Sequence, residues 1–517
     1  MGKRIPLLVN LLLLVWFSAS AAMSYAEQPL NVDGQRQLFV DDYLIESISG
    51  LQRTLGAVQK SSSNPVVPRS EPWEAARAEL YGSAIWNSQQ QRYELFYSAM
   101  HQPYDSRLAV AYSTDAVQWT KPELNLYPFQ GDATTNIVYV LPQDDPGIQG
   151  QYAHMGAWVH GPSVIYDAHD SDGSRRYKMI TNAGNGYLNV LFSPDGQQWT
   201  TYANNPVINI TSDTGNSVLW DPDLDKYVLY ARARDGSGVR EVSRAESSDF
   251  INWTTPQTVY TPTAADRAQS LEFYGQSVTL YEGVYVGLTW LFPNTPDSIS
   301  AAVDTPVTWP VLSVSRDGIS WQRVSDEPFL PLGPLGDFDH RQIRPASSLV
   351  ERPDEIVLMY SGSPHPHVSS HNFDIGMAKL RLDGFASLDA GATEATLITK
   401  PLTFAAGELF INADVQPGGY IRVGLFDAES NPIDGYTVEL CDAVLGDQLS
   451  ALVTWNDHTS LPDSLPDGTR LEFRMVNAKL YSFQIQPVAV PEPPASSLLL
   501  FGLAGTFMGI RGHGTRQ

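Results

Sequence analysis

Five residues with chemically competent side chains stand at corresponding points of a repeated pattern. Each lies at the start of a short apolar stretch, and the five are Glu79, His160, Asp213, Glu272 and Asp339. Glycoside hydrolysis uses two carboxyl groups, one protonated as the acid and one ionised as the base or nucleophile. When several carboxyl groups lie close together, their mutual repulsion raises the pKa of at least one of them. That group stays protonated and can serve as the general acid. The four carboxylates in this set are therefore candidates for acid–base catalysis, if the fold brings them together.

Glu272 and Asp339 form the preferred catalytic pair. Asp339 stands in GDFDHRQIRP beside arginines that should keep it ionised, as a base or nucleophile must be. Glu272 stands in SLEFYGQS among aromatic residues, which should raise its pKa and suit an acid. Glu79 and Asp213 are the alternative pair.

Residues that bind a ligand should surround these acids. Arginine, histidine and carboxylate side chains hydrogen-bond sugar hydroxyls, and an aromatic ring can stack on the apolar face of a pyranose. The candidates at strand starts and in loops are His101, His160, Arg232, Arg234, Trp290, His340, Arg344 and His365.

Metal binding is a weaker interpretation of the same chain. The loop SPHPHVSSHN holds the imidazoles of His365, His367 and His371, which with a carboxylate could bind a divalent metal. Hydrogen bonding to a ligand or to the backbone is the preferred role for them. The stretches DAHDSDG and DPDLDKY resemble calcium loops, but they fall in predicted hairpin turns that other repeats fill without acids. The sequence predicts no required cofactor and leaves open a divalent cation, structural or beside the acids.

A Ser-Asp-Trp element recurs along the chain as YSTDAVQWT, FSPDGQQWT, SSDFINWT and SVSRDGISW. An aromatic-aliphatic run precedes each element, and a further short strand precedes that run. In the fullest form, Asp195-Gly196 supplies the positive backbone angles of a tight hairpin, and Trp199 should pack between neighbouring repeats. Each repeat therefore predicts four antiparallel strands, which is the blade of a propeller.

Five blades are predicted, over 78–121, 158–201, 213–255, 271–323 and 339–382. The first strand of each blade lines the channel and begins at the ligand-binding face, so the candidate residues should gather in a funnel. After 383 the repeat ends, and strands such as LFINADV and LEFRMV predict a β-sandwich over 384–487. Residues 27–77 should close or brace the ring. The predicted fold is all-β, a five-bladed β-propeller over 78–383 followed by a C-terminal β-sandwich.

Composition excludes some partners. The 517 residues carry a formal net charge of −24, and a nucleic acid or an anionic lipid surface needs a basic face instead. The single cysteine, Cys441, excludes an internal disulfide and should be a buried apolar residue.

Both ends of the chain are typical of targeting signals. In 1–26, Lys3 and Arg4 precede an apolar run and small residues up to Ala26, which predicts a signal peptide cut by signal peptidase. In 488–517, a Pro-Glu-Pro triplet precedes the apolar run ASSLLLFGLAGTFMGI and terminal arginines. This tail resembles the PEP-CTERM sorting signal of Gram-negative bacteria. The resemblance implies processing by an exosortase, only transient membrane contact through this short segment, and a secreted or cell-surface, extracellular-matrix location.

The phrases PWE at 72–74, LFVDDYLIE at 38–46 and YSTDAVQWTKPELNLY resemble secreted bacterial proteins of the clan of glycoside hydrolase families 32 and 43. The resemblance implies a carbohydrate substrate and an extracellular glycoside hydrolase. In the family pattern, carboxylates begin the first strands of blades one, two and three. Here Glu79, His160 and Asp213 hold those positions, so the acid of blade two is replaced. Because this acid is replaced, a non-catalytic glycan-binding or matrix protein is the alternative hypothesis. A sialidase-like enzyme is the least favoured hypothesis, since it requires six blades.

Overall fold

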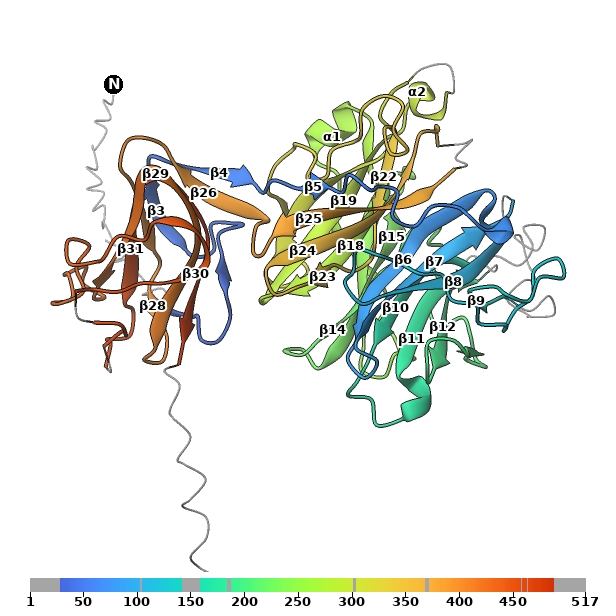
Figure 1. Ribbon diagram of the computed structural model, residues 1–517, viewed down its shortest axis with the longest axis horizontal. Coiled ribbons are helices and arrows are strands. Elements are labelled where there is room, and N and C mark those ends of the chain that lie inside the picture. The colour runs from blue at the N-terminus through green and yellow to red at the C-terminus, as the bar shows by residue number, and fades with distance from the viewer. Residues whose placement is uncertain are drawn as a thin grey trace, which may run out of the picture.

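The computed structural model describes residues 28–102, 105–141, 159–183, 187–300, 304–367, 372–456, 458–462 and 464–487. The predicted terminal signals, 1–26 and 488–517, and His371 lie outside them. In the described residues, antiparallel sheets form five propeller blades (Figure 1), and first strands of neighbouring blades contact one another. The predictions of an all-β chain and of a five-bladed propeller are confirmed.

The blades follow chain order, and each runs from the channel outward. Blade I comprises β6 (Arg77–Asn87), β7 (Arg92–Met100), β8 (Ser106–Ser113) and β9 (Ile137–Tyr139). Blade II comprises β10 (Val159–Tyr166), β11 (Tyr177–Ala183), β12 (Leu188–Ser193) and β13 (Thr200–Thr201). Blade III comprises β14 (Ser217–Asp221), β15 (Lys226–Arg234), β16 (Arg240–Ser247) and β17 (Gln257–Tyr260). Blade IV comprises β18 (Leu271–Tyr281), β19 (Val284–Pro293), β20 (Trp309–Ser315) and β21 (Gln322–Arg323).

Blade V closes the ring with a strand from the other end of the chain. Its strands are β22 (Gln342–Pro345), β23 (Val350–Glu351), β24 (Glu355–Ser363), β25 (Asp374–Arg381) and β5 (Gln59–Lys60). Strand β5 pairs antiparallel with β25, and Figure 1 shows this blue strand beside the orange ones. The last blade thus obtains its outermost strand from the N-terminal segment, and the ring closes without a seam of unpaired edges.

A serine from each blade faces the channel and joins that blade to the next. The serine ring comprises Ser83, Ser163, Ser217, Ser277 and Ser348, from the motifs GSA, PSV, NSV, QSV and SSL. Four hydroxyls of the ring accept a backbone N–H of the neighbouring blade: Val164 to Ser83 at 2.9 Å, Val218 to Ser163 at 3.1 Å, Val278 to Ser217 at 3.0 Å and Ala84 to Ser348 at 3.1 Å. Because a first strand has no partner on its channel side, these hydroxyls satisfy N–H groups that would otherwise be buried without acceptors.

The Ser-Asp-Trp elements form the hairpin turns between third and fourth strands. Asp195 accepts the backbone N–H groups of Gln197 at 2.9 Å and Gln198 at 2.8 Å, and Gly196 has φ of 75°. Trp199 packs against Phe96 of blade I, with ring centroids 6.2 Å apart. The predicted turn and the packing between blades are confirmed.

Residues 28–55 and 386–487 contribute to a second unit around its own core. Its strands are β1 (Leu30–Asn31), β2 (Gln37–Leu38), β3 (Ile45–Ser49), β4 (Leu51–Leu55), β26 (Ala386–Ala390), β27 (Ala395–Thr399), β28 (Leu402–Thr403), β29 (Glu408–Phe426), β30 (Gly446–Leu452) and β31 (Arg470–Gln486). Eight of them form one connected sheet, and β1 pairs with β28. The sequence predicts a sandwich over 384–487, whereas this unit also takes up β1 to β4, because their apolar residues complete its core.

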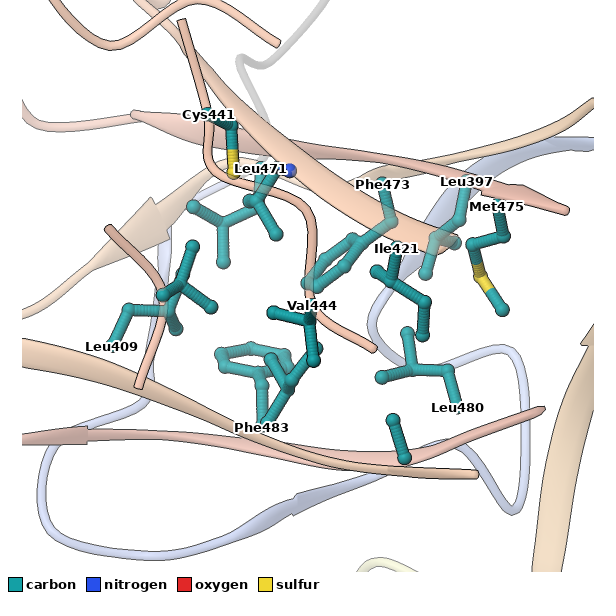
Figure 2. Close-up of a cluster of buried hydrophobic side chains, with 14 of the residues drawn as sticks. Leu397, Leu409, Ile421, Cys441, Val444, Leu471, Phe473, Met475, Leu480 and Phe483 are labelled. Carbon is teal, nitrogen blue, oxygen red and sulfur yellow. Dashed lines mark hydrogen bonds between the residues drawn. The ribbon is translucent and has the colours of Figure 1, made fainter. Parts of the chain in front are cut away.

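The core of this unit is apolar throughout (Figure 2). Cys441 lies in it with only 3% of its surface exposed, and burial raises the pKa of its thiol to about 11. Phe473 and Phe483, both on β31, lie with their ring centroids 6.1 Å apart. The prediction of Cys441 as a buried apolar residue is confirmed.

Asp383 links the propeller to the second unit. Its buried carboxylate accepts hydrogen bonds from Arg36 at 2.9 Å, from Tyr281 at 2.7 Å and from Ser482 at 2.6 Å. Helices are few and short: α1 (Ala264–Ala268), α2 (Pro296–Ile299) and the 3-10 turns η1 (Pro72–Glu74) and η4 (Gly173–Arg175). Across the described ranges, no helix is both long and apolar enough to cross a membrane.

Candidate functional site

The funnel is the end of the channel at which the first strands of blades I to IV begin. Glu79 lies on β6, His160 on β10 and Glu272 on β18, while Asp213 precedes β14. Arginines from blades I, III and V reach into the same region and pair with these acids. The structure therefore brings together the predicted residues of four blades and adds guanidinium groups to them.

Glu79 is completely buried between two arginines. It accepts a hydrogen bond from Arg77 at 2.8 Å and pairs with Arg344, which also donates to the hydroxyl of Tyr81 at 2.8 Å. Burial would raise the pKa of Glu79, but Arg77 and Arg344 outweigh it and hold that pKa below its usual value. Glu79 is thus an ionised residue that orders two arginines, and it is not a proton donor.

His160 replaces the expected acid of blade two and is also buried. Its ring meets the ring of Tyr81 edge to face, with centroids 5.0 Å apart. Burial lowers the pKa of His160 to about 4, although Glu79 and Asp213 act in the opposite direction. At neutral pH this blade therefore contributes an uncharged imidazole to the funnel.

Asp213 is the most accessible acid of the funnel, with 51% of its side chain exposed. It pairs with Arg232, whose second terminal nitrogen donates to the carbonyl of Tyr274. Partial burial would raise the pKa of Asp213, but Arg232, Arg234 and Arg240 together lower it. Asp213 is an ionised carboxylate that a ligand can reach.

Glu272 lies deeper, with 8% of its side chain exposed. It pairs with Arg240 at 2.7 Å, and Asn294 donates to its other oxygen at 2.7 Å. The sequence predicts aromatic surroundings and a raised pKa for this acid. In the structure, Arg240 of blade III lies over the ring of Phe292 and also pairs with Glu272, so a guanidinium group accompanies the aromatic ring at this acid.

Asp339 is buried in blade V and is held by different groups. It accepts hydrogen bonds from Lys60 on β5 at 2.6 Å and from Tyr360 on β24 at 2.9 Å. Within the described ranges, no hydrogen bond or ion pair joins Asp339 to Glu79, Asp213 or Glu272. The expected arginine beside it is absent, because ring closure brings Lys60 to this position.

The predicted binding residues divide into two groups. Arg232, Arg234, Arg344 and His160 lie in the funnel. His101 donates from its Nδ1 to the backbone carbonyl of Pro72 at 2.8 Å, His340 pairs with Asp304 at 2.9 Å, and His365 contacts Asn372 at 3.0 Å. These three histidines contact local backbone or neighbouring loop residues.

Trp290 does not offer a ring face to a sugar. Only 1% of its surface is exposed. The ring of Tyr81 covers it with centroids 5.8 Å apart, and the ring of Tyr274 with centroids 6.4 Å apart, both nearly parallel to the indole. This aromatic stack fills the channel below the charged residues, which is why the predicted role of Trp290 in stacking on a pyranose does not fit its position.

Two funnel arginines were missed by the sequence analysis, although a signal for each exists. Arg77 stands two residues before Glu79 on the same strand, so both side chains point to one face. Arg240 lies directly opposite Arg234 across the β15–β16 hairpin. His367 also belongs to the funnel: its Nε2 lies 3.0 Å from the hydroxyl of Tyr274, and burial with three nearby arginines lowers its pKa to about 3.

Metal ligands do not gather in the described part of the chain. No group of three or more histidine, cysteine, aspartate or glutamate side chains there is arranged to hold an ion. In the calcium-like stretch DAHDSDG, the buried ammonium of Lys178 lies 3.0 Å from Asp167 and 2.7 Å from Asp170. The ammonium group of Lys178 thus provides the positive charge beside these two aspartates.

A cavity of about 560 Å³ lies at the other end of the channel, where the first strands end. Its wall is mainly apolar, with Ile85, Val164, Leu219 and Leu280 among the lining residues, and the ring of Trp86 is 41% exposed at its rim. The cavity therefore differs from the funnel in its mainly apolar wall, although Asp167, His169 and Glu351 also line it.

No protein-family model and no curated protein matches the chain. Similar solved structures include an N-acetylgalactosamine deacetylase from F. plautii, with TM-score 0.40, 18% identity, 65% of this chain and 97% of that chain covered. A GH62 α-L-arabinofuranosidase catalytic domain from Coprinopsis cinerea has a TM-score of 0.42 and 14% identity, and the match covers 63% of this chain and 98% of that chain. A fructofuranosidase from Schwanniomyces occidentalis has a TM-score of 0.38 and 13% identity, and the match covers 83% of this chain and 100% of that chain. With scores and identities this low, these structures assign no function to the chain.

Proposed function

We propose that the protein is a glycoside hydrolase-like protein that binds an oligosaccharide or polysaccharide in the funnel. The observation that carries this proposal is the convergence of Glu79, Asp213 and Glu272 from three blades at one end of the channel. Arginines and uncharged imidazoles lie between them, so the surface offers donors and acceptors in the mixture that sugar hydroxyls require.

Asp213 and Glu272 are the proposed reacting pair. Asp213 is ionised and exposed, which suits a base that takes a proton from water or a nucleophile that attacks the anomeric carbon. Glu272 has one arginine partner, whereas Glu79 has two. When a ligand draws Arg240 away, the carboxyl group of Glu272 loses its positive partner in a nearly buried site, where it can carry a proton and transfer it to the departing glycosidic oxygen.

A non-catalytic glycan-binding protein is the second candidate, and one observation favours it. Each of the three funnel carboxylates is paired with an arginine, and the position of a further acid is held by His160. Such an arrangement gives each acid a positive partner, which suits binding of a ligand better than donation of a proton. A sialidase-like enzyme is disfavoured, because the described sheets make five blades and not six.

The test is incubation of the purified protein with neutral, uronic and sulfated polysaccharides, followed by measurement of released reducing sugar. Asp213→Asn and Glu272→Gln should each lower turnover by about 100-fold or more, as the loss of an acid–base group does. The matched control is Glu351→Gln, since Glu351 is also paired with an arginine but lines the cavity at the opposite end. Binding without release by the unmodified protein would establish the second candidate.

We also propose export, with removal of 1–26 by signal peptidase and processing of the tail at 488–517 by an exosortase. Support comes from the order of basic, apolar and small residues at the N-terminus and from the Pro-Glu-Pro triplet before the apolar tail. Mass spectrometry of the protein from its native Gram-negative host should find Glu27 as the first residue and a shortened C-terminus. An intact chain retained in the cytoplasm would reject this proposal.

A further inference from the structure

Three arginines share one face of the β15–β16 hairpin in blade III. Arg232 and Arg234 are two residues apart on β15, so their side chains point to the same side. Arg240 on β16 is the register partner of Arg234. Like charges directly opposite one another on neighbouring strands destabilise a sheet, so a position of this kind needs compensation.

The protein compensates two of these three charges. Arg232 pairs with Asp213, and Arg240 pairs with Glu272 at 2.7 Å. Arg234 is exposed and donates to the carbonyl of Gly238 at 2.8 Å. No carboxylate of the described residues lies within ion-pair distance of it.

Among the described residues, the funnel carries more positive than negative charge. Five guanidinium groups of these residues face three carboxylates there, an excess of two positive charges in a chain whose net charge is −24. The guanidinium groups are those of Arg77, Arg232, Arg234, Arg240 and Arg344. Burial and the charges of Arg240 and Arg232 lower the pKa of Arg234. One excess charge lies at buried Glu79, which pairs with both Arg77 and Arg344, and the other is that of exposed Arg234, which an incoming ligand can reach.

Some hydrogen-bond donors of the arginines on this face of the β15–β16 hairpin have no acceptor. The Nε atoms of Arg232 and Arg240 are buried and donate no hydrogen bond in the structure. A buried donor without an acceptor costs free energy unless a bound group supplies one. Charge and hydrogen bonding thus point in the same direction, toward an acceptor that carries negative charge.

We infer that the sugar bound in the funnel is acidic, and that its carboxylate or sulfate binds Arg234 and Arg240. This inference rests on the proposed function and specifies its substrate class. Guanidinium groups bind carboxylate and sulfate oxygens in pairs, which orients the ligand as well as holding it. An anion on Arg240 also competes with Glu272 for that arginine, so binding of the acidic sugar is the event that frees the proposed proton donor.

The experiment compares sugars that differ only in charge. Oligogalacturonates and the same oligomers reduced at C6 to neutral galactose are titrated into the protein by calorimetry, with a sulfated galactan oligosaccharide as the arm that separates sulfate from carboxylate. An acidic oligomer should bind at least about tenfold more tightly than its neutral counterpart, in line with hydrogen bonds between charged groups. Arg234→Gln should remove about tenfold of the affinity for the acidic oligomer and lower the affinity for the neutral one by a clearly smaller factor.

Arg176→Gln is the matched control. Arg176 also donates to one backbone carbonyl, that of Ala168 at 2.6 Å, but it lies in the first hairpin turn of blade II, away from the funnel. Its substitution should change neither affinity, and thermal unfolding of both variants shows whether they remain folded.

The outcomes separate this inference from the proposed function. Equal binding of neutral and acidic oligomers, or an Arg234→Gln variant that loses both equally, overturns the inference while the funnel remains a sugar site. Failure of every neutral, uronic and sulfated oligomer to bind overturns both. Loss of acidic binding in Arg176→Gln places the anion site outside the funnel and also rejects the inference.

Discussion

The two ends of the propeller channel are built from the same strands but differ in almost every chemical property. At the funnel end the strands begin with Glu79, His160, Asp213 and Glu272, four positions with three different residue types. Further along the channel each blade contributes a serine to the serine ring. At the far end the walls are mainly apolar and enclose a cavity of about 560 Å³.

This difference distinguishes the positions at which the blades need a common residue type from the positions at which the residue can vary between blades. In four blades a serine hydroxyl accepts a backbone N–H of the neighbouring blade, and in blade IV the hydroxyl of Thr279 accepts that of Leu349, so each blade needs a hydroxyl at this level of the channel. The strand starts satisfy no such shared requirement. They can diverge into carboxylates and an imidazole, and a binding site that is specific to one ligand needs that divergence.

The largest effect on stability should follow from Glu79→Gln at the funnel. The substitution leaves the buried guanidinium of Arg344 without its carboxylate, which should lower the free energy of unfolding by about 3–5 kcal/mol. Chemical denaturation measures it. Glu351→Gln at the far end is the control, because its pair with Arg36 is half exposed and should cost less than about 1 kcal/mol. Equal losses at the two ends would remove the electrostatic contrast between them.

A pH dependence should arise from His160. Its pKa of about 4 in the folded protein lies below the value near 6.5 of an unfolded chain. Between these values the unfolded chain binds a proton that the folded one does not, so the free energy of unfolding falls as pH drops from about 6.5 to 4, and His160 contributes no slope above that window. The contribution is on the order of 3 kcal/mol.

Denaturation of His160→Gln across this pH range measures that contribution as the difference from the unmodified protein. The variant should have a flatter profile. The exposed His169 serves as the comparison, and His169→Gln should leave the slope unchanged. An unchanged slope in His160→Gln would mean that the imidazole is charged in the folded state.

The serine ring should show a smaller effect, and a similar one in different blades. Ser163→Ala leaves the N–H of Val218 without its acceptor and should cost about 1–3 kcal/mol, and Ser217→Ala should cost about the same. Ser320→Ala, on the exposed side of a hairpin turn, should stay within about 0.5 kcal/mol of the original. Thermal unfolding of the three variants decides whether the ring acts as a repeated structural element.

The smallest effect should come from the cavity end. Trp86→Ala removes a partly exposed ring that packs on Tyr93 with centroids 4.6 Å apart, and it should cost at most about 1.5 kcal/mol. Sugar binding, measured by calorimetry, should not change. A clear loss of binding would move the ligand from the funnel to the cavity and reverse the comparison.

Most of the propeller could be predicted from the sequence, because its causes are local. Alternating strands, turn residues such as Asp195-Gly196 and the repeated Ser-Asp-Trp spacing each act over a few residues, and together they predict five blades and the end at which each strand begins. That reasoning also placed Glu79, His160, Asp213 and Glu272 correctly at strand starts, since the strand order alone determines which end of a blade they occupy.

Only the tertiary structure decided how those residues are paired. Arg344 reaches Glu79 from 265 positions away in the sequence, because ring closure brings the first and last blades together. Lys60 reaches Asp339 from 279 positions away, because β5 of the N-terminal segment completes blade V. Nothing in the local pattern shows that Arg240 neutralises Glu272 or that Tyr81 and Tyr274 cover Trp290. Local sequence determines the direction of a side chain, whereas its charge state and its access to a ligand depend on neighbours contributed by other blades.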